Sequence, residues 1–255
     1  VENGVYPAID ESLKKDIPAG IKIYKTKALE PFHLYKILSA QKKDSRIDNY
    51  VLKNKNSGLL ARLFKWIRFN IFIPDARVGW VPYAVHQGHK ILKEENIDVI
   101  FSSSPPHSLQ LTAMRLAGKS KLPWVADFRD PWSSIVYYQD EQRMLLPKKL
   151  DGWLERKVLH KANRVITISD EIKKDLDKIG QRSDTTVIYN GYDAADFNPQ
   201  TKSISTDKVK ITYAGFLSDT RIPQILLESL ANDSNQSFEN IELHIYGKTS
   251  PGFDR

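Results

Sequence analysis

Short apolar segments alternate with helical segments along residues 97–189, and this alternation limits the possible fold more than any other feature. Short β-branched runs such as Ile97 to Phe101 are typical of strands buried in a parallel sheet. Strands and helices that alternate at this spacing build parallel sheets with helical crossovers. The expected strands are 97–101, 123–128, 164–168 and 186–189, and the expected helices are 107–121, 151–162 and 169–179. The sequence therefore predicts an α/β fold with a doubly wound parallel sheet.

Local signals add further elements on both sides of this region. Ser169 is placed to cap the helix that follows it, and Gly180 sits where a helix C-cap belongs. Charged residues 40–58 indicate an exposed loop. The other expected elements are strands at 21–26, 208–216 and 241–247 and helices at 59–72, 80–96 and 223–231.

Turn signals divide the chain into two domains. Asn190-Gly191, an Asn-Pro pair and a Ser/Thr-rich run mark residues 190–207 as a connector. We therefore expect one domain over residues 1–189 and the start of a second α/β domain over residues 208–255. The second stretch is one βαβ unit, which is too little chain to bury a core of its own.

Polar residues gather where the first expected strand gives way to a helix. The expected loop from Ser102 to Pro106, with His107 and Ser108 after it, also contains Ser103 and Ser104. In open α/β sheets, ligands bind beyond the C-terminal strand ends, and N–H groups at the next helix N-terminus attract anions. A tight turn with proline in the first helical turn would explain the same residues without any ligand.

Three charged residues follow the second expected strand. Asp127, Arg129 and Asp130 stand at its C-terminal end, before Pro131 and Trp132. Charged residues at such a position usually form ion pairs or take part in binding or catalysis. The arginine fork can hold phosphate or carboxylate, and the aspartates can accept sugar hydroxyls. The alternative is a structural Arg–Asp lattice that holds the loop.

The helix expected at 59–72 combines aliphatic, aromatic and cationic residues. This composition fits a helix in a membrane interface, and it also fits a helix packed on a core. The formal net charge of +7 and the pI of about 9.3 favour polyanionic partners, including an anionic membrane surface. Nucleic acid is not expected as a partner, because the cations are scattered and no recognition motif is present.

Composition also limits the chemistry. The chain has no cysteine, which excludes a Cys-based metal site or a Cys nucleophile and fits a reducing, cytoplasmic setting. His86 and His89 lie three residues apart on an expected helix, but a metal site would need a third convergent ligand. We therefore interpret these histidines as part of a solvated helix face and expect no metal site.

Five sequence blocks, in this order within residues 70–220, resemble a bacterial branch of the family 4 glycosyltransferases. The blocks are Asn70 to Val81 with Ile73-Pro74-Asp75-Ala76-Arg77 at its centre, Val99 to Ser108, Pro123 to Trp132, Arg164 to Ser169, and Val187 to Asp193 with Phe197. The resemblance implies a GT-B enzyme, with two Rossmann-like domains and a cleft between them. Such enzymes transfer a sugar from a nucleotide sugar, usually with retention and without a metal ion or other cofactor.

The same resemblance implies where the enzyme works and which residues act. Acceptors in this branch are lipid-linked or cell-surface glycans, which implies a cytoplasmic protein, peripheral at the inner face of the cell membrane. Asp127, Arg129 and Asp130 are the expected catalytic residues at the cleft. The residues expected to bind donor or acceptor are Ser103, Ser104, His107, Asn190, Gly191, Gly215 and Arg221.

The chain departs from the family pattern in several places. Arg129 stands where many relatives have a histidine, and arginine cannot act as a base, so it would act electrostatically. Phe216 stands near the family's diphosphate-binding arginine, and Arg221 would replace its lysine. The family's glycine-rich loop would precede Val1 and its two donor-binding glutamates would follow Arg255, so this stretch alone is expected to be inactive.

Two other functions fit parts of the pattern. A non-catalytic sugar- or nucleotide-binding subunit of an envelope polysaccharide complex is favoured by the departures at Arg129 and Phe216. A different GT-B enzyme, such as a sugar-nucleotide epimerase, is the second.

Overall fold

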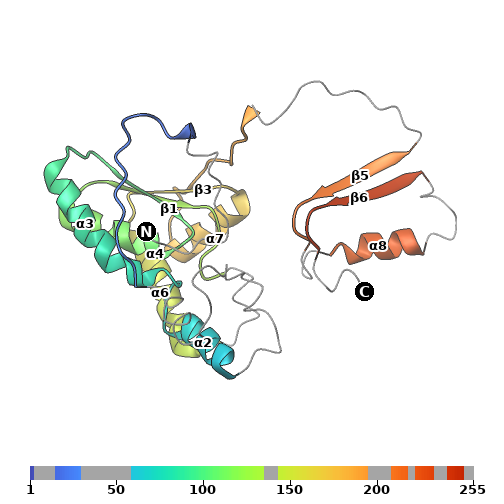
Figure 1. Ribbon diagram of the computed structural model, residues 1–255, viewed down its shortest axis with the longest axis horizontal. Helices are drawn as coiled ribbons and strands as arrows, with labels where there is room; N and C mark the ends of the chain where they lie inside the picture. The colour runs from blue at the N-terminus through green and yellow to red at the C-terminus, as the bar shows by residue number, and fades with distance from the viewer. Residues whose placement is uncertain are drawn as a thin grey trace. The chain divides into compact units, whose positions relative to one another are not determined.

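The computed structural model describes residues 1–2, 15–29, 59–134, 143–194, 208–217, 222–232 and 240–249. The chain divides into two compact units, Val1–Gly191 and Tyr192–Arg255, and both contain parallel strands (Figure 1). The charged loop expected at 40–58 lies outside the described residues.

A four-stranded parallel sheet forms the centre of the first unit. Its strands are β1 (Ile100–Ser104), β2 (Trp124–Phe128), β3 (Arg164–Thr167) and β4 (Thr186–Val187), in the order β1-β2-β3-β4. The helices between them are α4 (Ser108–Ser120), α6 (Leu145–Lys161) and α7 (Asp170–Gly180). The expected parallel, Rossmann-like α/β fold is confirmed. Because right-handed crossovers that step in one direction place their helices on the same side, α4, α6 and α7 cover one face of the sheet.

The core lies between this face and the helices. Trp124, Ala126 and Phe128 of β2 are completely buried there, together with Trp132 and Val165. Residues of β2 alternate between the two faces, so Asp127 lies on the opposite face from its neighbour Phe128.

The first strand differs from the expectation of a buried run over 97–101. It begins at Ile100 and continues through Ser104, and Phe101 is 59% exposed. The serines fit inside the strand because their hydroxyls are paired. Ser102 Oγ donates to Gln110 Oε1 at 2.6 Å and accepts from Trp124 Nε1 at 2.8 Å. Buried hydroxyls with partners carry little penalty, so polarity did not end the strand.

Among residues 59–99, which the structure describes, three helical elements precede the sheet. They are α2 (Leu59–Asn70), η2 (Val78–Trp80) and α3 (Val81–Glu94), which confirms the helices expected near 59–72 and 80–96. The strand expected at 21–26 is wrong, because described residues 15–29 contain no strand. Side chains hold this segment instead of a sheet. Thr26 Oγ1 accepts from Trp80 Nε1 at 2.7 Å, and Lys22 forms an ion pair with Glu95.

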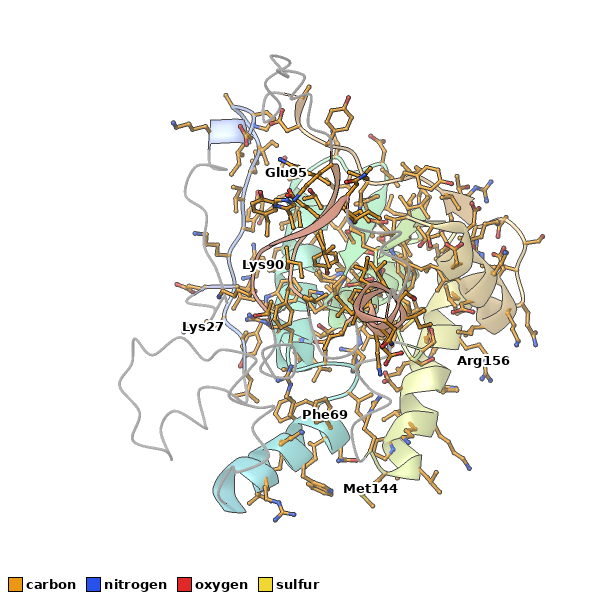
Figure 2. All side chains as sticks on the ribbon, turned by 90° about the vertical axis from the view of Figure 1, so that its right-hand side faces the viewer. Lys27, Phe69, Lys90, Glu95, Met144 and Arg156 are labelled. Carbon is orange, nitrogen blue, oxygen red and sulfur yellow. The ribbon has the colours of Figure 1, made fainter. Side chains whose placement is uncertain are left out.

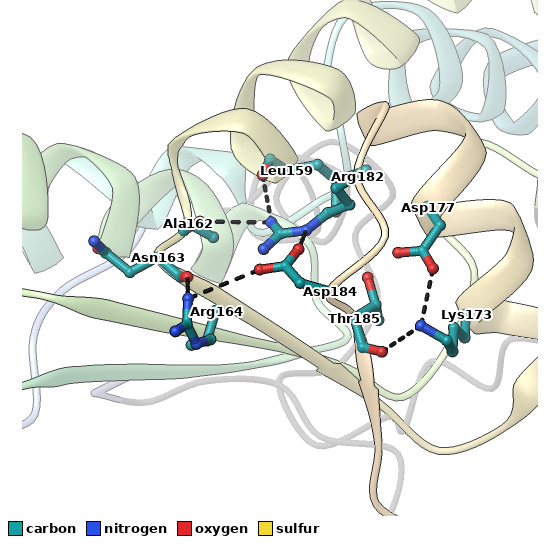
Figure 3. A network of polar contacts seen from close by, with 9 residues as sticks. All are labelled: Leu159, Ala162, Asn163, Arg164, Lys173, Asp177, Arg182, Asp184 and Thr185. Atoms are coloured by element: carbon teal, nitrogen blue, oxygen red, sulfur yellow. Dashed lines mark hydrogen bonds and ion pairs between the residues drawn. The ribbon is translucent and has the colours of Figure 1, made fainter.

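The ends of α6 and α7 are fixed by a polar network (Figure 3). Arg182 donates from Nη1 to the carbonyl of Leu159 at 2.7 Å and from Nε to Asp184 at 2.7 Å, so it satisfies an orphan carbonyl of α6. Ser169 caps α7 as expected, accepting from the Ile172 backbone N–H at 3.2 Å.

The C-cap of α7 differs from the expectation. Gln181, not Gly180, adopts the left-handed conformation there, with a φ of 48°. Gly180 instead packs closely against α6, since a Cβ at this position would lie 3.0 Å from Leu159 Cβ and would force a small shift of that side chain.

The second unit contains a two-stranded parallel sheet. β5 (Val209–Ala214) pairs with β6 (Ile241–Tyr246), and α8 (Gln224–Ala231) lies between them in the chain. This is the expected strand–helix–strand pattern.

Candidate functional site

Three of the expected site residues meet at the carboxyl ends of β1 and β2. Ser103 and Asp127 are register partners in the parallel pair, so their side chains emerge side by side on one face. Ser103 Oγ donates to Asp127 Oδ2 at 2.6 Å, and Arg129 Nε donates to the same oxygen at 3.1 Å. The backbone N–H of Arg129 also bonds to the Ser104 carbonyl at 3.0 Å, which continues the strand pairing beyond Phe128.

Burial differs sharply within this cluster. The side chain of Asp127 is 6% exposed, whereas that of Arg129 is 58% exposed. Within the described residues, the hydrogen bond between Arg129 and Asp127 runs through Nε, and the guanidinium belongs to a largely exposed side chain. A guanidinium can hold phosphate or carboxylate oxygens with two parallel bonds.

Ser104 lies inside the protein behind this cluster. Its hydroxyl donates to the Asp127 carbonyl at 3.2 Å and accepts from Gln110 Nε2 at 3.0 Å. Gln110 is completely buried and also donates to the Asp127 carbonyl at 2.8 Å. Sequence reasoning missed Gln110, although a lone amide between Leu109 and Leu111 in the first turn of the helix was the available signal. These contacts make Ser104 and Gln110 supports of the strand end.

His107 is separated from Asp127 by the sheet. Its ring stacks on Trp132 with a centroid distance of 4.9 Å and an interplanar angle of 9°, and it also stacks on Phe128. Phe128 and Asp127 point to opposite faces of the sheet, so the His107 ring that stacks on Phe128 lies on the other face from the Asp127 carboxylate. Burial lowers the pKa of His107 to about 4, so the ring is neutral at physiological pH.

The N-terminus of α4 already holds an anion of this chain. Asp75 accepts from the backbone N–H of Ser108 at 2.7 Å and from its hydroxyl at 2.9 Å. A carboxylate at this position is favoured by the helix dipole and satisfies an orphan N–H. The sequence predicted that this N-terminus offers free N–H groups to a ligand. At Ser108 that prediction is wrong, because Asp75 already accepts from its N–H group. Burial raises the pKa of Asp75 despite these bonds.

Two buried acids of α6 hold the loop that follows Arg129. Asp151 accepts from Trp132 Nε1 at 2.6 Å and from Arg143 Nη2 at 2.8 Å. One turn later, Glu155 accepts from the hydroxyl of Ser133. Burial raises the pKa of Glu155 to about 7. Sequence reasoning missed both acids, although their i, i+4 spacing places them in line with the buried Val158 and Leu159 of the same helix.

The structure does not show the remaining expected residues in contact with the Ser103–Asp127–Arg129 cluster, apart from the chain bond between Arg129 and Asp130. Asp130 is exposed beside Arg129, and Asn190 and Gly191 are exposed at the end of the first unit. Gly215 belongs to the second unit, where its φ of 144° accompanies a close approach to Gly247. A Cβ on Gly247 would lie 2.0 Å from the Gly215 carbonyl oxygen. Arg221 lies outside the described residues.

Two further features are absent from the same described ranges. His, Asp and Glu side chains there do not gather in groups of three or more that could hold a metal ion. Among those residues, too, every helix is too short or too polar to cross a membrane.

Comparison with known proteins identifies the family. The model of Glycosyltransferase Family 4 matches residues 38–196, which is well over half of the chain and includes all four strands of the first sheet. No curated protein matches the chain significantly. The Rossmann-like parallel sheet and the polar residues at its carboxyl edge agree with this match. The chain therefore belongs to glycosyltransferase family 4.

Proposed function

We propose that this protein transfers a hexosyl group from a nucleotide sugar to a lipid-linked or cell-surface glycan acceptor, with retention of configuration and without a metal ion. The observation that carries the proposal is the Asp127–Arg129 pair at the carboxyl edge of the sheet. A buried carboxylate that fixes a largely exposed arginine side chain is suited to binding an anionic substrate in one orientation.

Arg129 would act on charge and not as a base. A guanidinium stays protonated, so it would stabilise negative charge on a leaving diphosphate or hold a substrate phosphate. Asp127 would keep the guanidinium in place through its bond to Nε. Asp130, exposed beside this pair, would accept hydrogen bonds from sugar hydroxyls.

The two units would divide the substrates between them. Residues 1–189 would hold the acceptor, and residues 208–255 would begin the domain that holds the nucleotide sugar. Gly215 and Arg221 would approach the donor diphosphate, because glycine allows close backbone approach and arginine supplies charge. Asn190 and Gly191 would shape the crossover between the domains.

We also propose that the protein is cytoplasmic and contacts the inner face of the cell membrane through α2. Leu63 and Trp66 of this helix are exposed, and α2 contains three cations and no acidic residue. Apolar and cationic side chains on one helix favour an anionic bilayer surface.

Donor consumption tests the proposed reaction. The full-length protein would be incubated with a panel of radiolabelled uridine and guanosine diphosphate sugars and a bacterial lipid extract as acceptor. We expect one donor to release its nucleoside diphosphate while the label enters the lipid fraction, and omission of the extract to suppress this transfer.

Other outcomes would favour the rival functions. The exposed Phe216 near the expected diphosphate site is the observation that favours a non-catalytic partner subunit. Nucleotide binding without sugar transfer would support that rival, and conversion of the donor into an epimer would support an epimerase.

A further inference from the structure

The residues of α6 divide by charge between its two faces. Both acidic residues of this helix, Asp151 and Glu155, are buried. All of its lysines and arginines are exposed: Lys148, Lys149, Arg156, Lys157 and Lys161. The outer face of α6 therefore carries positive charge and no carboxylate.

Large apolar side chains lie on that same outer face. Leu146, Leu150 and Trp153 follow an i, i+4, i+7 spacing that places them along one side of the helix, and we call these three residues the α6 stripe. Leu146 is 76% exposed and Trp153 is 50% exposed. Lys157 Nζ lies 4.5 Å from the Trp153 ring centroid, so charge and apolar surface are interleaved. Such a stripe is typical of a helix that lies in a bilayer interface.

The start of α6 is joined to the end of α2. Arg143 Nε donates to the Phe69 carbonyl at 3.2 Å, and the Met144 backbone N–H donates to Asn70 Oδ1 at 2.8 Å. Figure 2 shows Phe69 and Met144 at the same end of the first unit. The exposed apolar residues at the start of α6 and those of α2 thus belong to one end of this unit.

We propose that α6, through the α6 stripe and its neighbouring lysines, forms a second membrane-binding helix that docks on an anionic lipid bilayer together with α2. This inference rests on the membrane contact proposed above for α2. Charge complementarity favours the bilayer as the partner, because neither helix exposes a carboxylate while both carry cations. Exposed leucines favour a surface with an apolar interior over nucleic acid, whose phosphates would contact the lysines alone.

The inner face of α6 gives this docking a consequence for the reaction. Asp151 holds Trp132 and Glu155 holds Ser133, both within four residues of Arg129. One helix therefore contacts lipid on its outer face and anchors the loop after Arg129 on its inner face. A lipid-linked acceptor would meet Arg129 at a height above the bilayer that α6 sets.

Residues 1–255 contain no cysteine, so a single introduced cysteine can carry a fluorescent label once any cysteine outside this stretch is replaced by serine. Leu146→Cys, Trp66→Cys and Tyr83→Cys variants of the full-length protein would each carry one environment-sensitive label. Tyr83 is exposed on α3 and serves as the matched control. With vesicles of equimolar phosphatidylcholine and phosphatidylglycerol, labels at positions 146 and 66 should shift to the blue, and the label at 83 should not. Vesicles of phosphatidylcholine alone should produce a much smaller shift.

Each outcome decides the proposal. A label at 146 that stays in water while the label at 66 shifts would overturn the role of α6 and leave the α2 contact intact. A blue shift at position 146 that occurs without vesicles and grows with protein concentration would show that the α6 stripe binds a second copy of the protein. That result would also overturn the proposal.

Vesicle flotation provides an independent measurement. Leu146→Glu combined with Trp153→Glu should lower partitioning to anionic vesicles by about tenfold or more, since it removes apolar insertion and adds repulsion. Nucleotide binding should be unchanged in this variant. If the unmutated protein does not bind nucleotide at all, that result would count against the proposed transferase and not against membrane docking. Unchanged flotation of the folded double variant would contradict the proposal.

Discussion

Arg129 Nε donates a hydrogen bond of 3.1 Å to Asp127 Oδ2, and the two side chains differ strongly in exposure. The carboxylate is buried, whereas the arginine side chain is largely exposed. Asp127 also accepts from Ser103 at 2.6 Å. Asp127 and Arg129 are only two positions apart at the end of β2, so this pair forms locally once β2 is in the sheet.

Neutralising Asp127 should destabilise the fold. Asp127→Asn replaces one acceptor oxygen by a donor and removes the charge that holds Arg129, which should cost about 1–3 kcal/mol. Asp130→Asn is the matched control, because its exposed side chain should change stability by no more than about 0.5 kcal/mol. Urea unfolding of both variants measures the difference. Equal stability of the two would contradict the buried role of Asp127.

Glu155 should make the protein less stable as the pH rises. Its pKa moves from 4.5 to about 7 on burial, so the folded state holds a proton that the unfolded state releases in this interval. Stability from this group is fully present below pH 4.5 and is lost as the pH rises through about 7. The total is about 3 kcal/mol, since each pH unit is worth about 1.4 kcal/mol.

The variant Glu155→Gln isolates this effect. Glutamine keeps an acceptor for Ser133 but does not titrate. Relative to wild type, the variant should gain stability between pH about 5 and about 8 in urea unfolding. A constant difference across that range would refute the raised pKa.

His107 should make the protein less stable as the pH falls, which is the opposite pH dependence to that of Glu155. Burial lowers its pKa from 6.5 to about 4, so the unfolded state takes up a proton first as the pH falls. Its contribution to stability is present above pH 6.5 and is lost toward pH 4. His107→Phe retains a ring against Trp132 without titrating, so wild type should lose up to about 3 kcal/mol relative to this variant on acidification. Chemical unfolding across this pH interval provides the check, and parallel stability curves would be inconsistent with a buried neutral ring.

The alternation of strands and helices was predictable because periodicity and cap residues are local signals. The parallel sheet and the cap at Ser169 followed from them. The position of β1 was not predictable, because Ser102 and Ser104 are stabilised by Gln110 and Trp124, which the fold brings together. Without knowledge of these partners, the serines of residues 102–104 predicted a loop instead of a strand.

The candidate site was predictable only in part for the same reason. Asp127 and Arg129 stood out as charges at the end of an apolar strand. The anion at the start of α4 was not foreseen, because Asp75 lies 33 residues away from Ser108. His107 was grouped with the site by its place in the sequence, whereas the alternation of side chains along β2 puts it against Phe128 and Trp132 on the other face.

Glycosyl transfer by Arg129 variants of the full-length protein tests the central claim most directly. Arg129→Ala should lower kcat by about 10²–10³-fold, because it removes a preorganised charge next to the reacting groups. Arg129→Lys should recover part of the rate, since lysine restores the charge without the fork. Arg115→Ala, which removes an exposed arginine of α4, should leave the rate unchanged. Wild-type kcat in a correctly folded Arg129→Ala variant would contradict the claim that this residue acts at the reacting centre.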